Sequence, residues 1–303
     1  MSVEENKDQQ VLVTGVSGRA AGAIAERMQA AGYGVRALVR TPEQAAMAKL
    51  NGWVPVHGDL TDPPSLRQAA VGAAVVVHAA AYSGLDWTLA QTVNVDGARE
   101  LAQASLQAGA GRFVHISTMS VHGEVQPDGL DEESPLTPDE PSPYCASKAR
   151  AELALREVGA RGLTMTILRP GAICSLTSSA WGDELVSEMR ENGWPAFLHP
   201  EDVIPWVHTE DLAEMAWLAA THPAAAGQTF IAVDRNVAIG DLHGAIAAAL
   251  SLPVMPPDRA PEISRCKVGK IRQYLGYMPR HTFEHTVATL VGMARAGGRG
   301  TAG

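Results

Sequence analysis

Hydrophobic positions recur with two different periods at the start of the chain. A short apolar run at residues 10–14 ends in a glycine turn, and the next segment repeats apolar residues at helical spacing, at Ala21, Ile24, Met28 and Ala31. The run predicts a buried strand, and the repeat predicts an amphipathic helix. The chain therefore begins with a strand and a helix that packs on a sheet.

The same alternation continues as far as residue 168. Further strands are predicted at residues 35–39, 53–56, 74–78, 113–117 and 164–168, and further helices at residues 42–50, 64–70, 86–108 and 143–158. Several of these strands are almost continuously apolar, as in sheets that are covered on both faces. The pattern predicts an α/β fold with a Rossmann-like, doubly wound parallel sheet.

The regular alternation ends near Arg169. Tryptophan, proline and histidine are scattered over residues 181–208. Helices resume at Asp211, Asp241 and Phe283. We expect a main domain over residues 1–170 and a small C-terminal substrate lobe over residues 171–303, from which some segments return to the main domain.

Composition and charge narrow the class of protein. The sequence is 46% apolar and 19% charged, so it can bury a sizeable core and is too apolar for extended disorder. The formal net charge is −9 and the 24 lysines and arginines are scattered, which disfavours a nucleic-acid partner. The cysteines at 145, 174 and 266 have neither zinc-site spacing nor an even count for disulfides, so no metal site is expected.

The polar start of the chain, its longest apolar stretch and its cysteines indicate a localisation. The polar start, residues 1–10, lacks the apolar core of a signal peptide. The most apolar stretch, residues 71–82, is shorter than the roughly 20 residues that span a bilayer. With cysteines suited to a reducing compartment, the chain is expected to be cytoplasmic and to have no membrane partner.

A glycine-rich turn joins the first predicted strand to the first predicted helix. It reads Thr-Gly-Val-Ser-Gly-Arg-Ala-Ala-Gly over residues 14–22. A Cβ at the glycines would block both the positive-φ backbone and the close approach of a diphosphate to the helix N-terminus. Because a strand precedes the loop and a helix follows it, the pattern favours a dinucleotide site over a simple turn.

The end of the second strand indicates which dinucleotide is bound. An acidic residue there would hold the ribose hydroxyls of NAD, but this chain has Arg40 between Val39 and Thr41. An arginine pairs with a 2′-phosphate, so NADP is favoured and NAD stays open. Arg19 in the glycine loop is expected to add a second positive charge near that phosphate. The alternative is that Arg40 is only a solvated strand-end residue.

Three further residues form a candidate catalytic set. Tyr144 and Lys148 lie four residues apart on a predicted helix that has Ser142 as its N-cap, so they share one face. A lysine ammonium beside a phenol stabilises the phenolate and lowers a pKa that is about 10 when unperturbed. Thr118 follows a strand and is expected at the carboxyl edge of the sheet, where its hydroxyl can hold a substrate oxygen.

With these features the chain resembles the extended short-chain dehydrogenase/reductase superfamily over nearly its whole length. Within it, the chain is similar to the branch of NAD(P)-dependent epimerases, dehydratases and dihydroflavonol-reductase-like enzymes. The motifs are the glycine loop, His-Gly-Asp-Leu at 57–60, His-Ala-Ala-Ala at 78–81, Asn-Val-Asp-Gly at 94–97, residues 113–123, Tyr-Cys-Ala-Ser-Lys at 144–148, Arg-Pro-Gly at 169–171 and Val-His-Thr-Glu-Asp-Leu-Ala at 207–213. One departure is Ala21 at the third glycine of the loop, a position that tolerates alanine.

The resemblance implies roles for individual residues. Tyr144 is the general acid/base, Lys148 tunes it and holds the nicotinamide ribose, and Thr118 positions the reacting oxygen. The implied cofactor contacts are Gly15, Ser17, Gly18, Arg19, Ala20, Arg40, Asp59, Leu60, Ala79, Ala80, Ala81, Asn94, Tyr144, Lys148, Pro170, Ala172 and Ile173. The substrate candidates are Tyr82, Met119, His122 and Trp181. A homodimer through the helices at residues 86–108 and 143–158 would follow the family's habit.

Some of these positions have a second explanation. His122 is equally explained as a neutral imidazole hydrogen-bonded to the backbone. Trp194 and Trp206 are better explained as core of the lobe than as substrate contacts. The acidic loop at residues 128–140 is a candidate flap over the site, although a solvated surface loop is the default.

The residues beside the motifs narrow the range of possible reactions. Family dehydratases place an Asp-Glu pair after the catalytic threonine, where this chain has Met119 and Ser120. Family epimerases show Tyr-Gly-Pro after Arg-Pro-Gly and carry a long insertion, both missing here. We expect an NADP-dependent oxidoreductase that reduces a carbonyl or oxidises a secondary alcohol of a small, partly apolar substrate. The alternatives are a nucleotide-sugar epimerase, with Arg190 or Arg235 on the diphosphate, and a non-catalytic NAD(P)-sensing protein.

Overall fold

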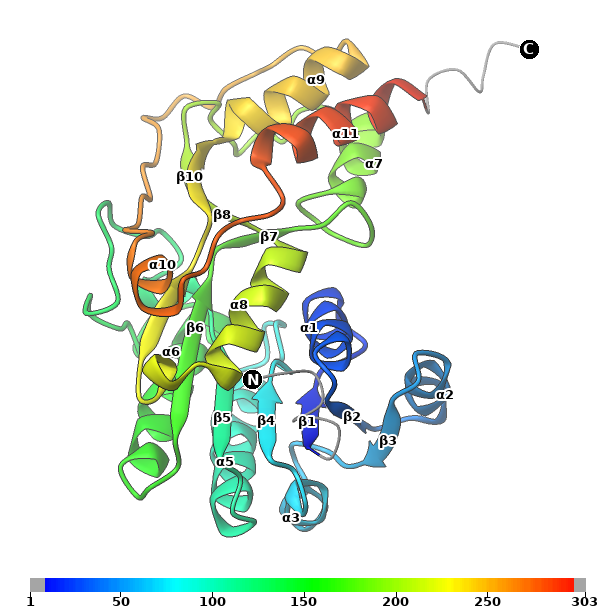
Figure 1. Ribbon diagram of the computed structural model, residues 1–303. Helices are drawn as coiled ribbons and strands as arrows, with labels where there is room; N and C mark the ends of the chain where they lie inside the picture. Colours follow the sequence, from blue (N-terminus) through cyan, green and yellow to red (C-terminus); the bar gives the residue numbers. More distant parts are fainter. Residues whose placement is uncertain (1–8, 297–303) are drawn as a thin grey trace.

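The computed structural model describes residues 9–296, so the polar start of the chain lies almost wholly outside the described residues. The main sheet contains β1 (Gln10–Thr14), β2 (Gly34–Val39), β3 (Val54–His57), β4 (Val75–His78), β5 (Arg112–Ile116), β6 (Met165–Pro170) and β9 (Thr229–Ala232). Among the described residues it has seven strands in the order β3-β2-β1-β4-β5-β6-β9, all paired in parallel. The predicted Rossmann-like parallel sheet is confirmed (Figure 1).

Helices cover both faces of this sheet. They are α1 (Arg19–Ala30), α2 (Pro42–Leu50), α3 (Pro63–Ala70), α5 (Ala98–Gln107), α6 (Pro143–Gly159) and α8 (Thr209–Thr221). The helix predicted at residues 86–108 is one continuous run of three parts, α4 (Trp87–Leu89), the π-helical η1 (Ala90–Gly97) and α5. A π-helical turn widens the helix and is often found at functional sites.

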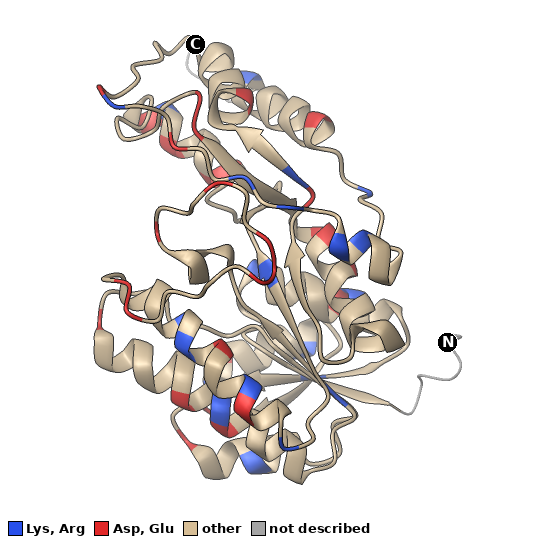
Figure 2. Cartoon of the chain, turned by 90° about the vertical axis from the view of Figure 1, so that its left-hand side faces the viewer, with Lys and Arg blue, Asp and Glu red and all other residues tan. Residues whose placement is uncertain are grey.

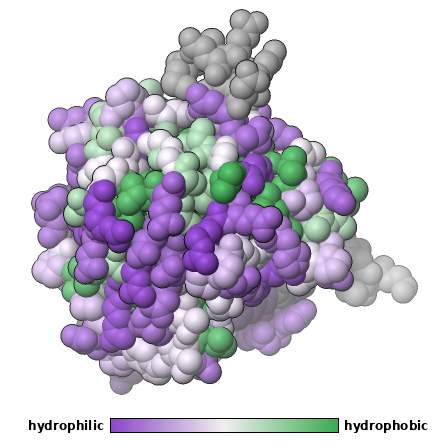
Figure 3. All heavy atoms as spheres, turned by 90° about the horizontal axis from the view of Figure 1, so that it is seen from below, coloured by the Kyte–Doolittle hydropathy of each residue, from purple (hydrophilic) through white to green (hydrophobic). Residues whose placement is uncertain are grey.

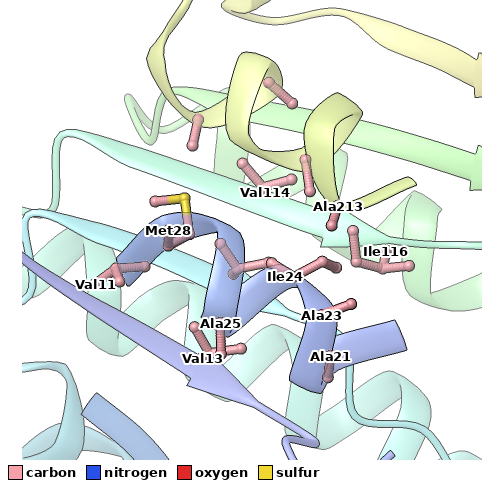
Figure 4. Packing of buried hydrophobic residues seen from close by; sticks show 14 of the residues in the cluster. Val11, Val13, Ala21, Ala23, Ile24, Ala25, Met28, Val114, Ile116 and Ala213 are labelled. Atoms are coloured by element: carbon pink, nitrogen blue, oxygen red, sulfur yellow. The ribbon is translucent and has the colours of Figure 1, made fainter. Parts of the chain in front are cut away.

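The alternation of strand side chains builds two separate core layers. Val11 and Val13 face α1 and α8, whereas Leu12 between them faces α3, α5 and α6. Figure 4 shows Ile24 and Met28 of α1 packed over the sheet residues, with small alanines where the helices approach. Burying each large apolar side chain of this kind contributes about 1.5–3 kcal/mol. The packing holds the C-terminal ends of the strands at one rigid edge.

A smaller lobe lies over that edge (Figure 1). Its sheet consists of β7 (Ala172–Cys174), β8 (Val203–His208) and β10 (Arg235–Ala238), in the order β10-β8-β7. Its helices are α7 (Asp183–Asn192), the π-helical η4 (Gly240–Gly244) with α9 (Ala245–Leu250), and α11 (Phe283–Ala296). Trp194 and Trp206 are buried in the core of this lobe. The core-packing explanation of these two tryptophans therefore agrees with the structure.

Short elements complete the fold. They are the 3-10 helices η2 (Met119–His122) and η3 (Pro223–Ala225), and α10 (Lys270–Leu275), which packs beside β9. None of the helices between residues 9 and 296 has the length and apolar character of a membrane span. Basic and acidic residues are mixed over the side seen in Figure 2, and the face seen from below in Figure 3 shows its apolar residues in small separate groups.

Candidate active site

The glycine loop lies against the end of β4 so closely that only glycine fits. Gly15 has a φ of +79°, and a Cβ there would lie 2.8 Å from the backbone of Ala80. Gly18 caps α1, and its amide donates to the Gly15 carbonyl at 2.8 Å. The Thr14 hydroxyl joins the same two loops, because it accepts hydrogen bonds from the amides of Ala79 and Ala80 at 3.2 and 3.1 Å. The N-terminus of α1 is thus left open toward a cleft.

A cavity of about 320 Å³ follows this loop. It is lined by Gly15, Val16, Ser17, Gly18, Leu38, Arg40, Gln44, Gly58, Asp59, Leu60, Ala79, Ala80, Ala81, Tyr82 and Val93. Most of the positions predicted to hold the cofactor therefore meet in one place. Tyr82, a substrate candidate, lines this cavity and not the one beside Thr118.

The far end of the cavity carries an exposed arginine. The guanidinium of Arg40 lies 3.8 Å from the Asp59 carboxylate. Burial raises the pKa of Asp59, but hydrogen bonds from Thr61 and the charge of Arg40 outweigh it, and the pKa lies below its usual range. Arg19 is elsewhere, with its guanidinium 3.1 Å from the Ser175 hydroxyl and 3.6 Å from Glu210. Arg19 therefore contacts Ser175 and Glu210, and it does not supply the second positive charge that was expected beside Arg40.

Asn94 occupies η1, beside the cofactor cavity but not in its lining. Its side-chain oxygen accepts from the Tyr82 amide at 2.7 Å, and its nitrogen donates to the Tyr82 carbonyl at 2.8 Å and to the Ser147 hydroxyl at 2.9 Å. These bonds use both N–H donors and one of the two lone pairs of the oxygen, and the residue is buried. In this structure Asn94 therefore fastens the segment after β4 to α6.

The catalytic candidates meet at the ends of β5 and α6. The Thr118 hydroxyl caps η2 by accepting from the Ser120 amide at 3.1 Å, and it also hydrogen-bonds the Tyr144 phenol. Burial raises the pKa of Tyr144, and the bond with Thr118 opposes that rise without cancelling it. The predicted lowering of this pKa by Lys148 is wrong for the protein by itself, because burial of the phenol outweighs the other effects.

Lys148 is directed into the protein. Its side chain is 2% exposed, and its Nζ donates to the Ile116 carbonyl at 2.8 Å and lies 3.3 Å from Nε2 of His115. Burial lowers the pKa of Lys148 to about 8, although the carboxylate of Glu152 acts in the other direction. The lysine shares a helix with Tyr144 as predicted, but its amino group is held by β5.

A buried ion pair behind this site could not be found from the sequence. Arg169 at the end of β6 donates to both oxygens of Glu152 on α6, at 2.9 and 2.7 Å, and the Ser117 hydroxyl donates to the same carboxylate at 2.6 Å. Arg169 is 1% exposed and Glu152 is fully buried. Their only sequence signals are the Arg-Pro-Gly motif and a glutamate four residues after the catalytic lysine.

His122 belongs to this buried network. Its Nδ1 lies 2.8 Å from the Pro135 carbonyl, and its Nε2 lies 3.3 Å from a guanidinium nitrogen of Arg169. The carbonyl can only accept and the guanidinium can only donate, so the ring is neutral with the proton on Nδ1. Both nitrogens are used inside the protein, and the substrate role suggested for His122 does not fit this structure.

A second cavity, of about 540 Å³, opens between the sheet edge and the lobe. The main domain contributes Thr118, Met119, Ser120, Glu124 and Gln126, and the lobe contributes Gly171, Ala172, Trp181, Phe197, Leu198, Asp202, Val203, Ile204, Pro205, Ile239, Arg259, Glu262 and Ser264. Two of the four substrate candidates, Met119 and Trp181, are present. Pro170 and Ile173, expected at the nicotinamide, are in neither lining among the described residues, although their neighbours Gly171 and Ala172 are.

The charged groups of this second cavity are largely paired. Arg259 donates to both oxygens of Asp202, at 2.9 and 2.6 Å, and to the carbonyls of Phe197 and Ala260 at 2.9 Å each. Asp202 also accepts from the amides of His199 and Glu262, each at 2.8 Å. Glu124 and Glu262 are exposed at the cavity. Arg259, the one arginine in the described lining, therefore already uses its donors on groups of the protein itself.

The arginines considered for a diphosphate lie elsewhere. Arg190 donates to the Ala294 carbonyl at 3.1 Å, and Arg235 pairs with Glu284. The acidic loop is also tied down, because Asp128 pairs with Arg265 at 2.5 Å and Asp131 pairs with Lys267 at 2.9 Å. The loop is anchored to the segment before α10, which does not support a free flap.

Comparison with known proteins agrees with this architecture. The model of the NAD dependent epimerase/dehydratase family matches residues 11–233. A 4-hydroxy-2-methyl-3-oxo-4-farnesyl-3,4-dihydroquinoline-1-oxide ketoreductase of Stigmatella aurantiaca is 32% identical over 181 residues, 59% of this chain and 54% of that protein. A dTDP-glucose 4,6-dehydratase of Streptomyces antibioticus is 28% identical over 254 residues, 78% of this chain and 74% of that protein. The match thus spans about half the length of the first relative.

Solved structures share the fold over almost the whole chain. A short-chain dehydrogenase/reductase superfamily protein from Agrobacterium tumefaciens, crystallised with bound NAD, superposes with a TM-score of 0.80 at 24% identity, over 95% of this chain and 98% of that one. The family model covers more than half of the chain and includes the glycine loop, Thr118, Tyr144 and Lys148. The chain belongs to the NAD dependent epimerase/dehydratase family.

Proposed function

We propose that this enzyme uses NADP to interconvert a carbonyl and a secondary alcohol on a small, partly apolar substrate. The observation that carries the proposal is the hydrogen bond between Tyr144 and Thr118, because Thr118 lines the cavity between sheet and lobe. A hydroxyl and a phenol at the carboxyl edge of the sheet can together hold and protonate one substrate oxygen.

The first cavity fits a dinucleotide. Gly15, Ser17 and Gly18 line this cavity just before the first turn of α1, an arrangement that suits a diphosphate. The glycine loop would hold the diphosphate, Asp59 and Leu60 the adenosine, and Arg40 the 2′-phosphate. When bound, the dinucleotide supplies or accepts the hydride.

The protein's own groups handle the proton. In the reductive direction, Tyr144 donates its phenolic proton to the carbonyl oxygen, while Thr118 donates a hydrogen bond to that oxygen. The raised pKa of Tyr144 keeps the phenol protonated at neutral pH, which suits a proton donor. In the oxidative direction the same phenolate takes the proton of the alcohol. Lys148, one helical turn from Tyr144 with its amino group held by β5, would hold the nicotinamide ribose.

The second cavity favours a substrate without a diphosphate. Met119, Trp181 and Phe197 supply apolar and aromatic surface. Arg259 is already bonded to Asp202, so an anionic group would have to compete with a carboxylate for it. Glu262 also lies 3.6 Å from Arg259, and the exposed Glu124 adds a further negative charge that repels anions. These features support a small neutral ketone or alcohol over the nucleotide-sugar alternative.

Replacement of Tyr144 by phenylalanine tests the assignment. We expect Tyr144→Phe to lower kcat by about 10²- to 10⁴-fold, the usual contribution of a general acid/base. Affinity for NADPH, measured by fluorescence titration, should stay close to that of the wild type. Tyr274→Phe, at an exposed position on α10, is the matched control. Unchanged turnover in Tyr144→Phe would refute the acid/base role, and NADPH binding without turnover of any carbonyl panel by the wild type would favour the sensing alternative.

A further inference from the structure

Two buried histidines lie under the catalytic lysine, and the mechanism above does not use either of them. His78 at the end of β4 and His115 on β5 are each 1% exposed, and their rings are 5.3 Å apart with a tilt of 31°. Nε2 of His115 lies 3.3 Å from Nζ of Lys148. The lysine amino group therefore ends on an imidazole inside the protein.

The proton positions on both rings follow from their partners. An ammonium group can only donate, so Nε2 of His115 accepts and its proton is on Nδ1, which has no partner among the described residues. The Thr14 hydroxyl accepts from two amides, so its own proton goes to Nδ1 of His78 at 2.8 Å. Both imidazoles are neutral, since burial and the charge of Lys148 lower the pKa of His78 to about 3 and hold the pKa of His115 well below 6.5.

Two of the N–H donors of Lys148 have partners inside the protein. An ammonium has three N–H donors. The Ile116 carbonyl accepts one at 2.8 Å and His115 is placed to accept a second at 3.3 Å. One N–H remains, and its direction is set by the other two because the three bonds diverge tetrahedrally from one nitrogen.

We propose that His115 is a positioning residue that aims the remaining N–H of Lys148 at the ribose of the cofactor. The proposal rests on the proposed function, in which Lys148 holds that ribose. An aliphatic residue at position 115 would leave a buried donor unpaired, and a carboxylate would hold the lysine as an ion pair. A neutral imidazole accepts a hydrogen bond without adding charge.

The charged surroundings of Lys148 are few. His78 and His115 face it from β4 and β5, and Tyr144 and Glu152 lie one turn away on its own helix. Glu152 is already paired with Arg169 of β6, and the neighbouring residue of η1, Asn94, does not titrate. Removing the His115 acceptor should therefore change the pKa of Lys148 directly, because no second charge is present to compensate.

The test compares two substitutions of His115. His115→Gln keeps a side-chain acceptor and His115→Leu removes it. The first readout is the titration of Lys148 in the cofactor-free protein, followed by the ¹³C shift of its Cε and assigned with Lys148→Met. Because a hydrogen bond to the ammonium favours the charged form, we expect the leucine variant to titrate about one pH unit below the wild type and the glutamine variant to match the wild type.

The second readout is cofactor binding and turnover. We expect His115→Leu to weaken NADPH binding and lower kcat by about tenfold each, with the substrate KM little changed, and His115→Gln to recover most of both. His243→Leu, at a buried lobe histidine that likewise has an unpaired Nδ1, is the matched control. If His115→Leu does not fold, His115→Met fills the same place with only a weak acceptor.

The possible outcomes test the positioning role of His115 and the substrate proposal separately. Equal Lys148 titration in wild type and His115→Leu overturns the positioning role, and so does an equal loss of activity in the leucine and glutamine variants. A shifted titration with no turnover of carbonyls by the wild type leaves the positioning role supported and refutes the substrate proposal.

Discussion

At the scale of single residues, the proposed preference for NADP over NAD depends on Arg40. Its side chain is 64% exposed, and its guanidinium lies 3.8 Å from Asp59. An exposed pair of this kind contributes at most about 1 kcal/mol, whereas a hydrogen bond between charged groups contributes about 1.5–3 kcal/mol. A 2′-phosphate should therefore displace Asp59 as the partner of Arg40.

Arg40→Ala tests this preference. We expect the Kd for NADPH to rise about 10- to 100-fold, the equivalent of one lost charge-assisted hydrogen bond, while the Kd for NADH changes less than about twofold. Fluorescence titration with each cofactor measures both values. Arg67→Ala, at an exposed position on α3, should leave both unchanged. An unaltered ratio of the two Kd values in Arg40→Ala would show that Arg40 does not recognise the phosphate.

For single residues, the sequence predicted the site only where nearby residues in the chain determine the geometry. The spacing of Tyr144 and Lys148 placed both on one helix because helical geometry is local. The direction of Lys148 could not be predicted, because it depends on His115 and on the Ile116 carbonyl, more than thirty residues earlier on another element. The pKa of Tyr144 was predicted in the wrong direction for the same reason, since the burial that raises it comes from tertiary packing.

At the scale of elements, the Glu152–Arg169 pair joins α6 to β6 and, through Ser117, to the end of β5. All of its groups are buried, and the charge of Glu152 is compensated mainly by Arg169, with the half-exposed Arg156 3.6 Å away as a second partner. Removing one partner of such a pair usually costs about 3–5 kcal/mol, because the remaining charge stays buried without compensation. The pair therefore fixes α6, which carries Tyr144 and Lys148, against β5 and β6.

Glu152→Gln should weaken folding in a pH-dependent way. Burial raises the pKa of Glu152, but the bond and charge of Arg169 outweigh it, and the folded-state pKa lies below its usual value. The stabilisation is then complete above the unfolded-state pKa of about 4.3 and is lost as the pH falls through the lower folded-state pKa.

Urea unfolding at a series of pH values measures the effect. We expect Glu152→Gln to be about 3–5 kcal/mol less stable than the wild type at pH 7, and the difference to shrink below about pH 4.3. Glu157→Gln, at an exposed position on the same helix, should differ little from the wild type at any pH. A deficit that does not change with pH would contradict this account.

Elements with a strong local signal were predicted and the others were not. The strands of the main sheet up to β6 are apolar runs between helices, and each was predicted within a few residues. β7 is three residues long and β8 contains Pro205, so neither shows the usual period of a strand. β9 joins β6 in parallel only after the chain has passed through the lobe, a pairing that no local pattern indicates.

At the scale of the whole molecule, substrate choice depends on how the lobe meets the sheet edge. Segments far apart in the chain close the second cavity, since Arg259 binds Asp202 and Ser264 donates to the Gln126 carbonyl. Such contacts form only once both parts have folded, so the sequence could indicate a lobe but not the charge of its cavity. That charge decides between the proposed substrate and a nucleotide sugar.

A nucleoside diphosphate provides the final test. We expect UDP and dTDP not to compete with a neutral ketone in the wild type with NADPH bound, because Arg259 is engaged by Asp202. Asp202→Asn keeps an acceptor for only one of the His199 and Glu262 amides, which bond different oxygens, and it removes the carboxylate charge, so it should loosen Arg259 and make inhibition by either diphosphate measurable. Asp258→Asn, at an exposed position next to Arg259, should behave like the wild type. Tight diphosphate binding by the wild type, lost in Arg259→Gln, would instead establish this arginine as a phosphate ligand and favour the epimerase alternative.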